Sequence, residues 1–305
     1  MEKIVVVTRK TRLQELVERF NTLAQAKFYI EHSGGDFAEY EHENDAYARS
    51  LEVVHKSLDL ELKLQFIERD FLPTFVFTAD DLVVTLGQDG LVANTAKYAK
   101  NQPIIAVNPD PERFDGVLLP FAPSEAHRAA AEVLTRKARI THVTMAEAVF
   151  NDGQRMIAFN DLFIGVRTHV SARYKIQLSG KSEAQSSSGI LVSTGVGSTG
   201  WLSSVFNMAR GIAALSGGRS GPPIRLEWSD PRLLFVVREP FISRHSTADI
   251  VAGMIAQGQE LVLESTTPSG GCVFSDGIEG DFVEFNSGSI ARIRASNESA
   301  QLVMK

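Results

Sequence analysis

Hydrophobic residues in the first third of the chain form short runs that alternate with amphipathic stretches. Continuous apolar runs, typical of strands buried on both faces, occupy residues 4–7, 82–86 and 103–107. Residues 60–66 alternate apolar and polar positions, which predicts another strand, and residues 45–58 carry apolar side chains at helical spacing. A further helix is predicted over 91–100. This succession indicates an open parallel sheet flanked by helices.

The pattern changes after an alanine-rich stretch at 124–137 that predicts a helix with Ser124 as its N-cap. Short strands follow, at residues 139–149, 155–159, 172–178, 190–193, 233–237, 248–253, 260–264, 272–275 and 281–285. Asn151-Asp152-Gly153 is typical of a hairpin turn, and the serine-rich residues 182–188 are expected to form a loop.

These patterns predict two domains. Residues 1–122 form an open α/β nucleotide-binding domain, and residues 123–287 form a β-rich, β-sandwich-like domain. The last segment, 288–305, is a candidate to pack back on the first domain. A chain of 305 residues is long enough for two cores.

Composition excludes several classes of protein. The 31 basic and 37 acidic residues give a net charge of −6, which argues against a nucleic-acid binder, although a small phosphate ligand needs only local donors. No apolar run approaches the roughly 20 residues of a membrane span. The one cysteine, Cys272, excludes an internal disulfide and a cysteine-based zinc cage.

The N-terminal residues carry no targeting signal. The apolar run at 4–7 is too short for a signal-peptide core, and Arg9, Lys10 and Arg12 follow it at once. We therefore expect a cytoplasmic protein; a processed organellar protein would show the same N-terminal pattern.

The first candidate motif is Gly87-Gln88-Asp89-Gly90, between the strand at 82–86 and a helix. Ligands of open α/β sheets bind at this end of the strands, and glycine N–H groups with a helix N-terminus favour phosphate. Asp89 would repel phosphate unless it takes a proton from an attacking hydroxyl or a metal ion lies between. The alternative is an ordinary turn in which Asp89 makes a local hydrogen bond.

The second motif is Asn160-Asp161, a polar pair between two apolar strand runs. Burying such a pair is costly without partners. Its amide and carboxylate could hold a ribose or an adenine edge. A turn or β-bulge is an equally good interpretation of the pair alone.

The third motif is the glycine-, serine- and threonine-rich loop at 193–200, which follows a strand and precedes a helix predicted over 201–210. Its N–H and hydroxyl groups suit a phosphate. Gly195, Gly197 and Gly200 satisfy G-x-G-x-x-G, but no βαβ unit with a later acidic residue surrounds them, so a Rossmann site is not indicated. Val196 excludes a serine-hydrolase elbow.

Together and in this order, these segments resemble the NAD kinase family, which has a G-G-D-G loop, an Asn-Glu/Asp pair and a later S-T-x-x-G-S-T-A-Y-like loop. The resemblance is greatest to its mitochondrial-type branch. The segments that carry it span nearly the whole chain: residues 10–12, 107–113, 158–165, 193–198, 237–240 and 284–288.

This resemblance implies transfer of the γ-phosphoryl group of ATP, or of polyphosphate, to the 2′-hydroxyl of the adenosine ribose of NAD, which gives NADP. It implies catalysis in a crevice between the domains, a divalent cation such as Mg²⁺ and a homo-oligomer, expected to be a dimer. Asp89 would be the general base, with the rest of the site formed by the phosphate-loop residues Gly87 and Gly90 and the dinucleotide-binding residues Asn160, Asp161, Ser198, Thr199, Gly200 and Trp201.

Gln88 departs from the family pattern, because it replaces the second glycine of G-G-D-G. A side chain there could crowd the phosphates or forbid a positive φ angle. Two alternatives therefore stay open: a related kinase acting on a lipid or sugar hydroxyl, and a non-catalytic NAD(P)-binding protein.

Overall fold

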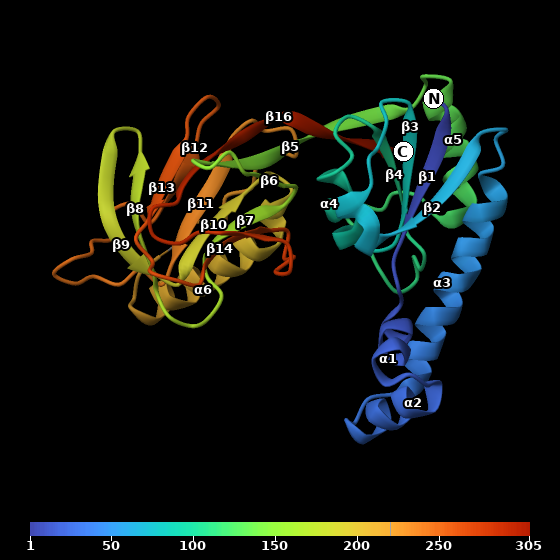
Figure 1. The fold of residues 1–305 in the computed structure, drawn as a ribbon, viewed down its shortest axis with the longest axis horizontal. Helices are drawn as coiled ribbons and strands as arrows, with labels where there is room; N and C mark the ends of the chain where they lie inside the picture. The colour runs from blue at the N-terminus through green and yellow to red at the C-terminus, as the bar shows by residue number, and fades with distance from the viewer. Residues whose placement is uncertain (220) are drawn as a thin grey trace. The chain divides into compact units, whose positions relative to one another are not determined.

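The computed structural model describes residues 1–219 and 221–305, and these divide into two compact units (Figure 1). The first unit comprises residues 1–141 and 301–305, and the second comprises residues 142–300. No helix within the described residues is both long enough and apolar enough to cross a membrane.

The first unit is built on a parallel sheet in the order β2-β1-β3-β4. Its strands are β1 (Lys3–Thr8), β2 (Lys63–Glu68), β3 (Asp81–Leu86) and β4 (Pro103–Val107). Strand β1 lies between β2 and β3, with Ile4 paired to Leu64 of β2 and to Leu82 of β3. The end of β16 (Ile290–Met304) extends this sheet, because Gln301 pairs in parallel with Pro103 of β4.

Helices bury both faces of the parallel sheet. One face packs against α3 (Phe37–Ser57) and α5 (Ala126–Leu134) in a core that includes Val54, Val84 and Ile105. Val5 and Val83, which point to the opposite face, are also completely buried. The continuous apolar runs of the sequence are explained by this two-sided burial.

Further helices complete this unit. They are α1 (Arg12–Phe20), α2 (Leu23–His32), α4 (Asp89–Ala96) and two 3₁₀ turns, η1 (Arg69–Thr74) and η2 (Pro123–Glu125). Helices α1 and α2 gather at one end of α3 (Figure 1). Thr11 begins α1 with a capping box, in which its hydroxyl accepts from Gln14 N and the Gln14 side chain accepts from Thr11 N.

The second unit is a sandwich of two antiparallel layers. One layer is the sheet β12-β11-β10-β7-β14-β15, and the other contains β9, β8, β13 and most of β16, with β5 and β6. The strand bounds are β5 (Arg139–Phe150), β6 (Arg155–Ala158), β7 (Asp161–Val166), β8 (Ala172–Leu178), β9 (Lys181–Ser187), β10 (Gly189–Ser193), β11 (Leu233–Arg238), β12 (Ala252–Ile255), β13 (Leu261–Ser265), β14 (Gly271–Ser275) and β15 (Phe282–Glu284).

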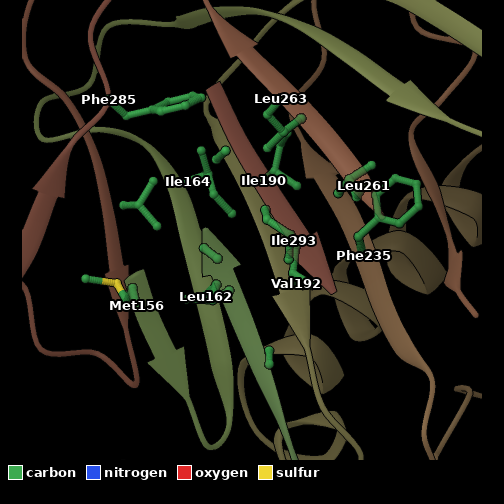
Figure 2. Packing of buried hydrophobic residues seen from close by; sticks show 14 of the residues in the cluster. Met156, Leu162, Ile164, Ile190, Val192, Phe235, Leu261, Leu263, Phe285 and Ile293 are labelled. Atoms are coloured by element: carbon green, nitrogen blue, oxygen red, sulfur yellow. The ribbon is translucent and has the colours of Figure 1, made fainter. Parts of the chain in front are cut away.

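The core of the second unit lies between these layers (Figure 2). Ile164 and Ile190 meet Leu263 and Ile293 from the opposite layer. The outer face of the six-stranded sheet is covered in part by α6 (Trp201–Leu215), which follows the short turn η3 (Gly197–Thr199). Leu202 of α6 packs there against Leu191 and Leu234.

The predicted fold class, an open α/β domain followed by a β-rich, sandwich-like domain, is confirmed. The division between the units lies at residue 141 rather than near 122, because α5 packs on the parallel sheet. The expected loop at 182–188 is wrong, since these residues form the edge strand β9, paired along its whole length with β8. Its serine-rich sequence hides the alternation that marks a strand.

Candidate functional site

The loops that follow β1 and β3 lie at the topological switch point of the parallel sheet. The chain crosses from β1 to β2 on one side, and then from β2 past β1 to β3 on the other. Open α/β sheets bind ligands at such a point, outside the carboxyl ends of the strands. Residues 87–90 follow β3 there, and residues 9–12 follow β1.

Position 87 of the loop favours glycine, because a larger residue would press on Leu91, whereas position 88 does not. A Cβ at Gly87 would lie 2.7 Å from Leu91 Cδ2 and 3.2 Å from Leu91 Cβ, whereas one at Gly90 would meet nothing within 4 Å. Gln88 is exposed and has φ −88° and ψ 170°, a conformation open to any residue. Its replacement of a motif glycine therefore causes no backbone strain.

Asp89 is the first residue of α4 and is partly exposed. Its carboxylate accepts hydrogen bonds from Leu118 N at 3.0 Å and from Val117 N at 3.2 Å. The bonds are not those of a local turn, because they reach a segment 28 and 29 residues further along the chain. Each oxygen keeps a lone pair for another donor.

Tyr47 of α3 joins the two loops at this edge and was not singled out by the sequence patterns. Its hydroxyl accepts from Arg9 N at 3.0 Å, after β1, and donates to Leu86 O at 3.0 Å, at the end of β3. Burial raises the pKa of Tyr47, which keeps its hydroxyl protonated and able to donate. A tyrosine at helical spacing gives no sequence signal for this contact.

The basic residues after β1 are engaged in ion pairs. Arg12 Nε lies 2.6 Å and an Arg9 guanidinium nitrogen 3.1 Å from the buried carboxylate of Glu43. Burial would raise the pKa of Glu43, but the hydrogen bonds from Arg12 and Arg9 outweigh it and lower that pKa. Lys10 pairs with Glu18 at 2.8 Å. A cavity of about 600 Å³ opens beside these residues, with an apolar wall that includes Leu13 and Val17.

In the second unit, Asn160 and Asp161 lie where β6 passes into β7, and their main chain is held on both sides. The N–H groups of Phe159, Asn160 and Asp161 donate to the Asp276 carboxylate at 3.1, 2.6 and 3.3 Å. On the other side, Thr194 Oγ1 donates to Phe159 O at 2.7 Å and Thr194 N to Asn160 O at 2.9 Å. The pair is therefore a fixed platform rather than a simple turn.

The side chain of Asp161 has the properties of a ligand-binding group. It is 7% exposed, and none of the described residues donates a hydrogen bond to its carboxyl group. Burial, together with the nearby charge of Asp276, raises its pKa to about 7. A buried carboxyl group without a protein partner is costly, and a bound hydroxyl group would satisfy it.

The glycine-rich loop after β10 packs directly on this platform. A Cβ at Gly197 would overlap the Asn160 carbonyl oxygen, so only glycine permits the contact. Ser198 is buried and donates to Gly195 O at 2.6 Å, whereas Thr199 and Gly200 are exposed. The structure thus brings Gly197, at the start of the segment 197–200, next to Asn160.

Trp201 follows this loop and stacks on Phe163 of β7, with ring centroids 5.6 Å apart and an interplanar angle of 16°. The Arg238 guanidinium lies 5.3 Å from the Trp201 ring centroid and 5.8 Å from that of Phe163. Arg238 belongs to a segment that carries the family resemblance, but the sequence assigned no role to this residue. Its place beside two aromatic rings marks it as a further candidate.

The sequence is similar to one curated protein over part of its length. No protein-family model matches the chain. Over 126 residues, 40% of this chain, the sequence is 31% identical to an NAD kinase of Chlorobium phaeobacteroides. The match spans 43% of that protein, so the chain covers less than half the length of this curated relative.

Two solved structures match nearly the whole chain. Yeast NADH kinase in complex with NADH has a TM-score of 0.58 at 17% identity, and the match covers 100% of this chain and 84% of that chain. The NAD kinase of Archaeoglobus fulgidus in complex with ATP has a TM-score of 0.56 at 16% identity, over 98% of this chain and 93% of that chain. The chain shares the fold of these two proteins.

The candidate residues fall into two groups within this fold. Gly87, Asp89 and Gly90 lie in the first unit, while Asn160, Asp161 and the loop to Trp201 lie together in the second. Among residues 1–219 and 221–305, no three His, Cys, Asp or Glu side chains are grouped so that they could hold a metal ion.

Proposed function

We propose that this protein is a member of the NAD kinase family and transfers the γ-phosphoryl group of ATP to the 2′-hydroxyl of the adenosine ribose of NAD, giving NADP. The observation that carries the proposal is the Asn160-Asp161 platform, where a buried carboxyl group that accepts no hydrogen bond from the described residues lies beside a glycine-rich loop. A lipid or sugar kinase would not need this dinucleotide-binding pair. The likeness to the Chlorobium NAD kinase supports the same activity.

In this proposal, each group has a distinct role. Asn160 and Asp161 hold the hydroxyls of the adenosine ribose, and the loop of Ser198, Thr199 and Gly200 contacts the dinucleotide together with Trp201. Gly87 and Gly90 shape the loop that receives the ATP phosphates. Asp89 accepts the proton of the attacking hydroxyl, because a carboxylate with free lone pairs at a phosphate loop suits a base.

Magnesium is part of the proposal. Mg²⁺ usually binds through one or two carboxylates plus substrate phosphates rather than in an all-protein cage. Asp89, with an open lone pair on each oxygen, fits this donor set when the ion arrives on the ATP phosphates. When bound, the ion would neutralise charge on the transferring phosphoryl group.

Several finer features belong to the same proposal. They are assignment to the mitochondrial-type branch, assembly as a homodimer, and a choice of donor and acceptor that includes polyphosphate and NADH. The NADH complex of the yeast enzyme makes NADH a natural second acceptor to test.

The test is formation of NADP or NADPH from NAD or NADH, ATP and Mg²⁺, followed with a dehydrogenase specific for the phosphorylated product. We expect turnover by the wild type. Absence of product with NAD and with NADH, using either ATP or polyphosphate as the donor, would overturn the proposal. Tight NAD binding without turnover would favour the non-catalytic alternative.

We expect Asp89→Asn to lower kcat by roughly 10²- to 10⁴-fold, as loss of a general base does, while NAD binding measured by calorimetry persists. Asp115→Asn is a matched control, because Asp115 is an exposed carboxylate in the segment that Asp89 contacts. Equal turnover by Asp89→Asn and the wild type would remove Asp89 from the mechanism.

A further inference from the structure

We propose that Asp276 is a positioning residue of the dinucleotide site: its carboxylate fixes the main chain that presents Asn160 and Asp161, and its charge makes occupancy of that site depend on pH. The inference rests on the proposed function, because it names what orients the dinucleotide-binding residues. Asp276 follows β14 and is more than 110 residues away in sequence from the pair it holds.

The geometry is that of an anion held by converging N–H groups. Three consecutive amides, from Phe159 to Asp161, donate to the two oxygens of Asp276 at 2.6 to 3.3 Å. Asp276 N donates in return to Asp161 O at 3.0 Å. Hydrogen bonds to a charged acceptor are about twice as strong as neutral ones, so this contact fixes the turn between β6 and β7.

The backbone of Asp276 is itself unusual. Its φ is +54°, a left-handed conformation that few residues other than glycine adopt. Such conformations are strained and persist where surrounding contacts over-determine them. Here the left-handed conformation turns the chain so that both the carboxylate and the N–H of one residue face the segment at 159–161.

The charge of Asp276 also acts on Asp161. The strand neighbours of β7 at this end are Ser193 of β10, opposite Asp161, and Ser275 of β14, opposite Leu162. Both are neutral, and the charge that acts on Asp161 is that of Asp276. Because the ionised form of Asp161 accepts from two ribose hydroxyls, NAD affinity should rise as pH increases through about 7.

The decisive variant is Asp276→Asn, which keeps the shape but has one acceptor oxygen and no charge. We expect NAD affinity, measured by calorimetry on the full chain, to fall roughly 10- to 100-fold. KM for NAD should rise more than kcat falls. The pH midpoint of binding should move to lower pH, since Asp161 then ionises more easily. Glu279→Gln is the matched control, because Glu279 is an exposed carboxylate in the same turn.

Amide hydrogen exchange tests, without any ligand, whether Asp276 holds residues 159–161. In Asp276→Asn we expect faster exchange at residues 159–161, with unchanged protection in β8 and β13. Unchanged exchange at 159–161, or faster exchange with unaltered NAD affinity and pH profile, would overturn the proposal. A wild type that neither binds NAD nor forms NADP would overturn the proposed function, and the exchange result would still decide whether Asp276 holds this segment.

Discussion

Asp161 is a buried carboxylic acid that the folded protein keeps protonated at mildly acidic pH. Burial, and next the charge of Asp276, raise its pKa from 3.8 to about 7. Between these values the unfolded chain has lost the proton that the folded protein still binds. The free energy of unfolding therefore falls, through this group, as pH rises from about 4 to about 7. Such a loss of stability is typical of a residue kept for ligand binding rather than for folding.

We expect Asp161→Asn to stabilise the protein at high pH. At pH 8 its free energy of unfolding should exceed that of the wild type by up to roughly 4 kcal/mol, since one pKa unit corresponds to about 1.4 kcal/mol. The gain should vanish near pH 4. Denaturant unfolding at both pH values measures it. An equal effect at pH 4 and pH 8 would contradict the assignment of the raised pKa to Asp161.

At the scale of elements, α3 contributes more than core packing. It covers one face of the parallel sheet through Val54, and its Tyr47 hydroxyl bridges the ends of β1 and β3. The bridge lies at the switch point, so α3 fixes the loop after β1 and the loop after β3, the second of which is proposed to receive the ATP phosphates. The 21 residues of α3 thus connect the core to the site.

We expect Tyr47→Phe to lower the free energy of unfolding by roughly 1–3 kcal/mol, because Arg9 N and Leu86 O would each lose a partner. KM for ATP should rise as well, since the loop after β3 would be less well fixed. Urea unfolding and initial rates measure the two effects. Tyr40→Phe is the control, because it keeps the ring that lies 4.5 Å from the Arg12 guanidinium. Equal stability of the two variants would contradict the bridge.

At the scale of the whole molecule, the last residues of the sequence return to the first unit. Strand β16 starts in the second unit, and its last residues, 301–305, belong to the first. Leu302 and Val303 are buried there, and Leu302 pairs with Ile104 of β4. The first unit is therefore completed only when residues 301–305 have been made.

We expect deletion of residues 301–305 to destabilise the first unit by roughly 3–6 kcal/mol, because two buried aliphatic side chains are lost. Thermal unfolding measures the loss of stability, and amide hydrogen exchange should show reduced protection in β3 and β4. Lys305→Met is the control, since the exposed Lys305–Glu125 ion pair contributes at most about 1 kcal/mol. Unchanged protection of β4 in the deletion would show that β16 is not needed there.

The pattern of apolar and polar residues predicted the parts of the fold in which burial is continuous or strictly periodic. The strands at 82–86 and 103–107 could be recognised because both of their faces are buried. Strand β9 could not, because its serine-rich sequence lies at a sheet edge where polar side chains are tolerated. Helices α1 and α2 were not predicted either, since few of their residues reach the core.

The sequence by itself determined the fold class and the order of the three candidate motifs, because both depend on the types and spacing of neighbouring residues. Only the tertiary structure decided what holds those motifs. Asp276 and Thr194 act on residues 159–161 across long stretches of chain, and Tyr47 joins two strands that are distant in sequence. Such contacts leave no local pattern, since a hydrogen bond depends on where two groups meet in space and not on their separation along the chain.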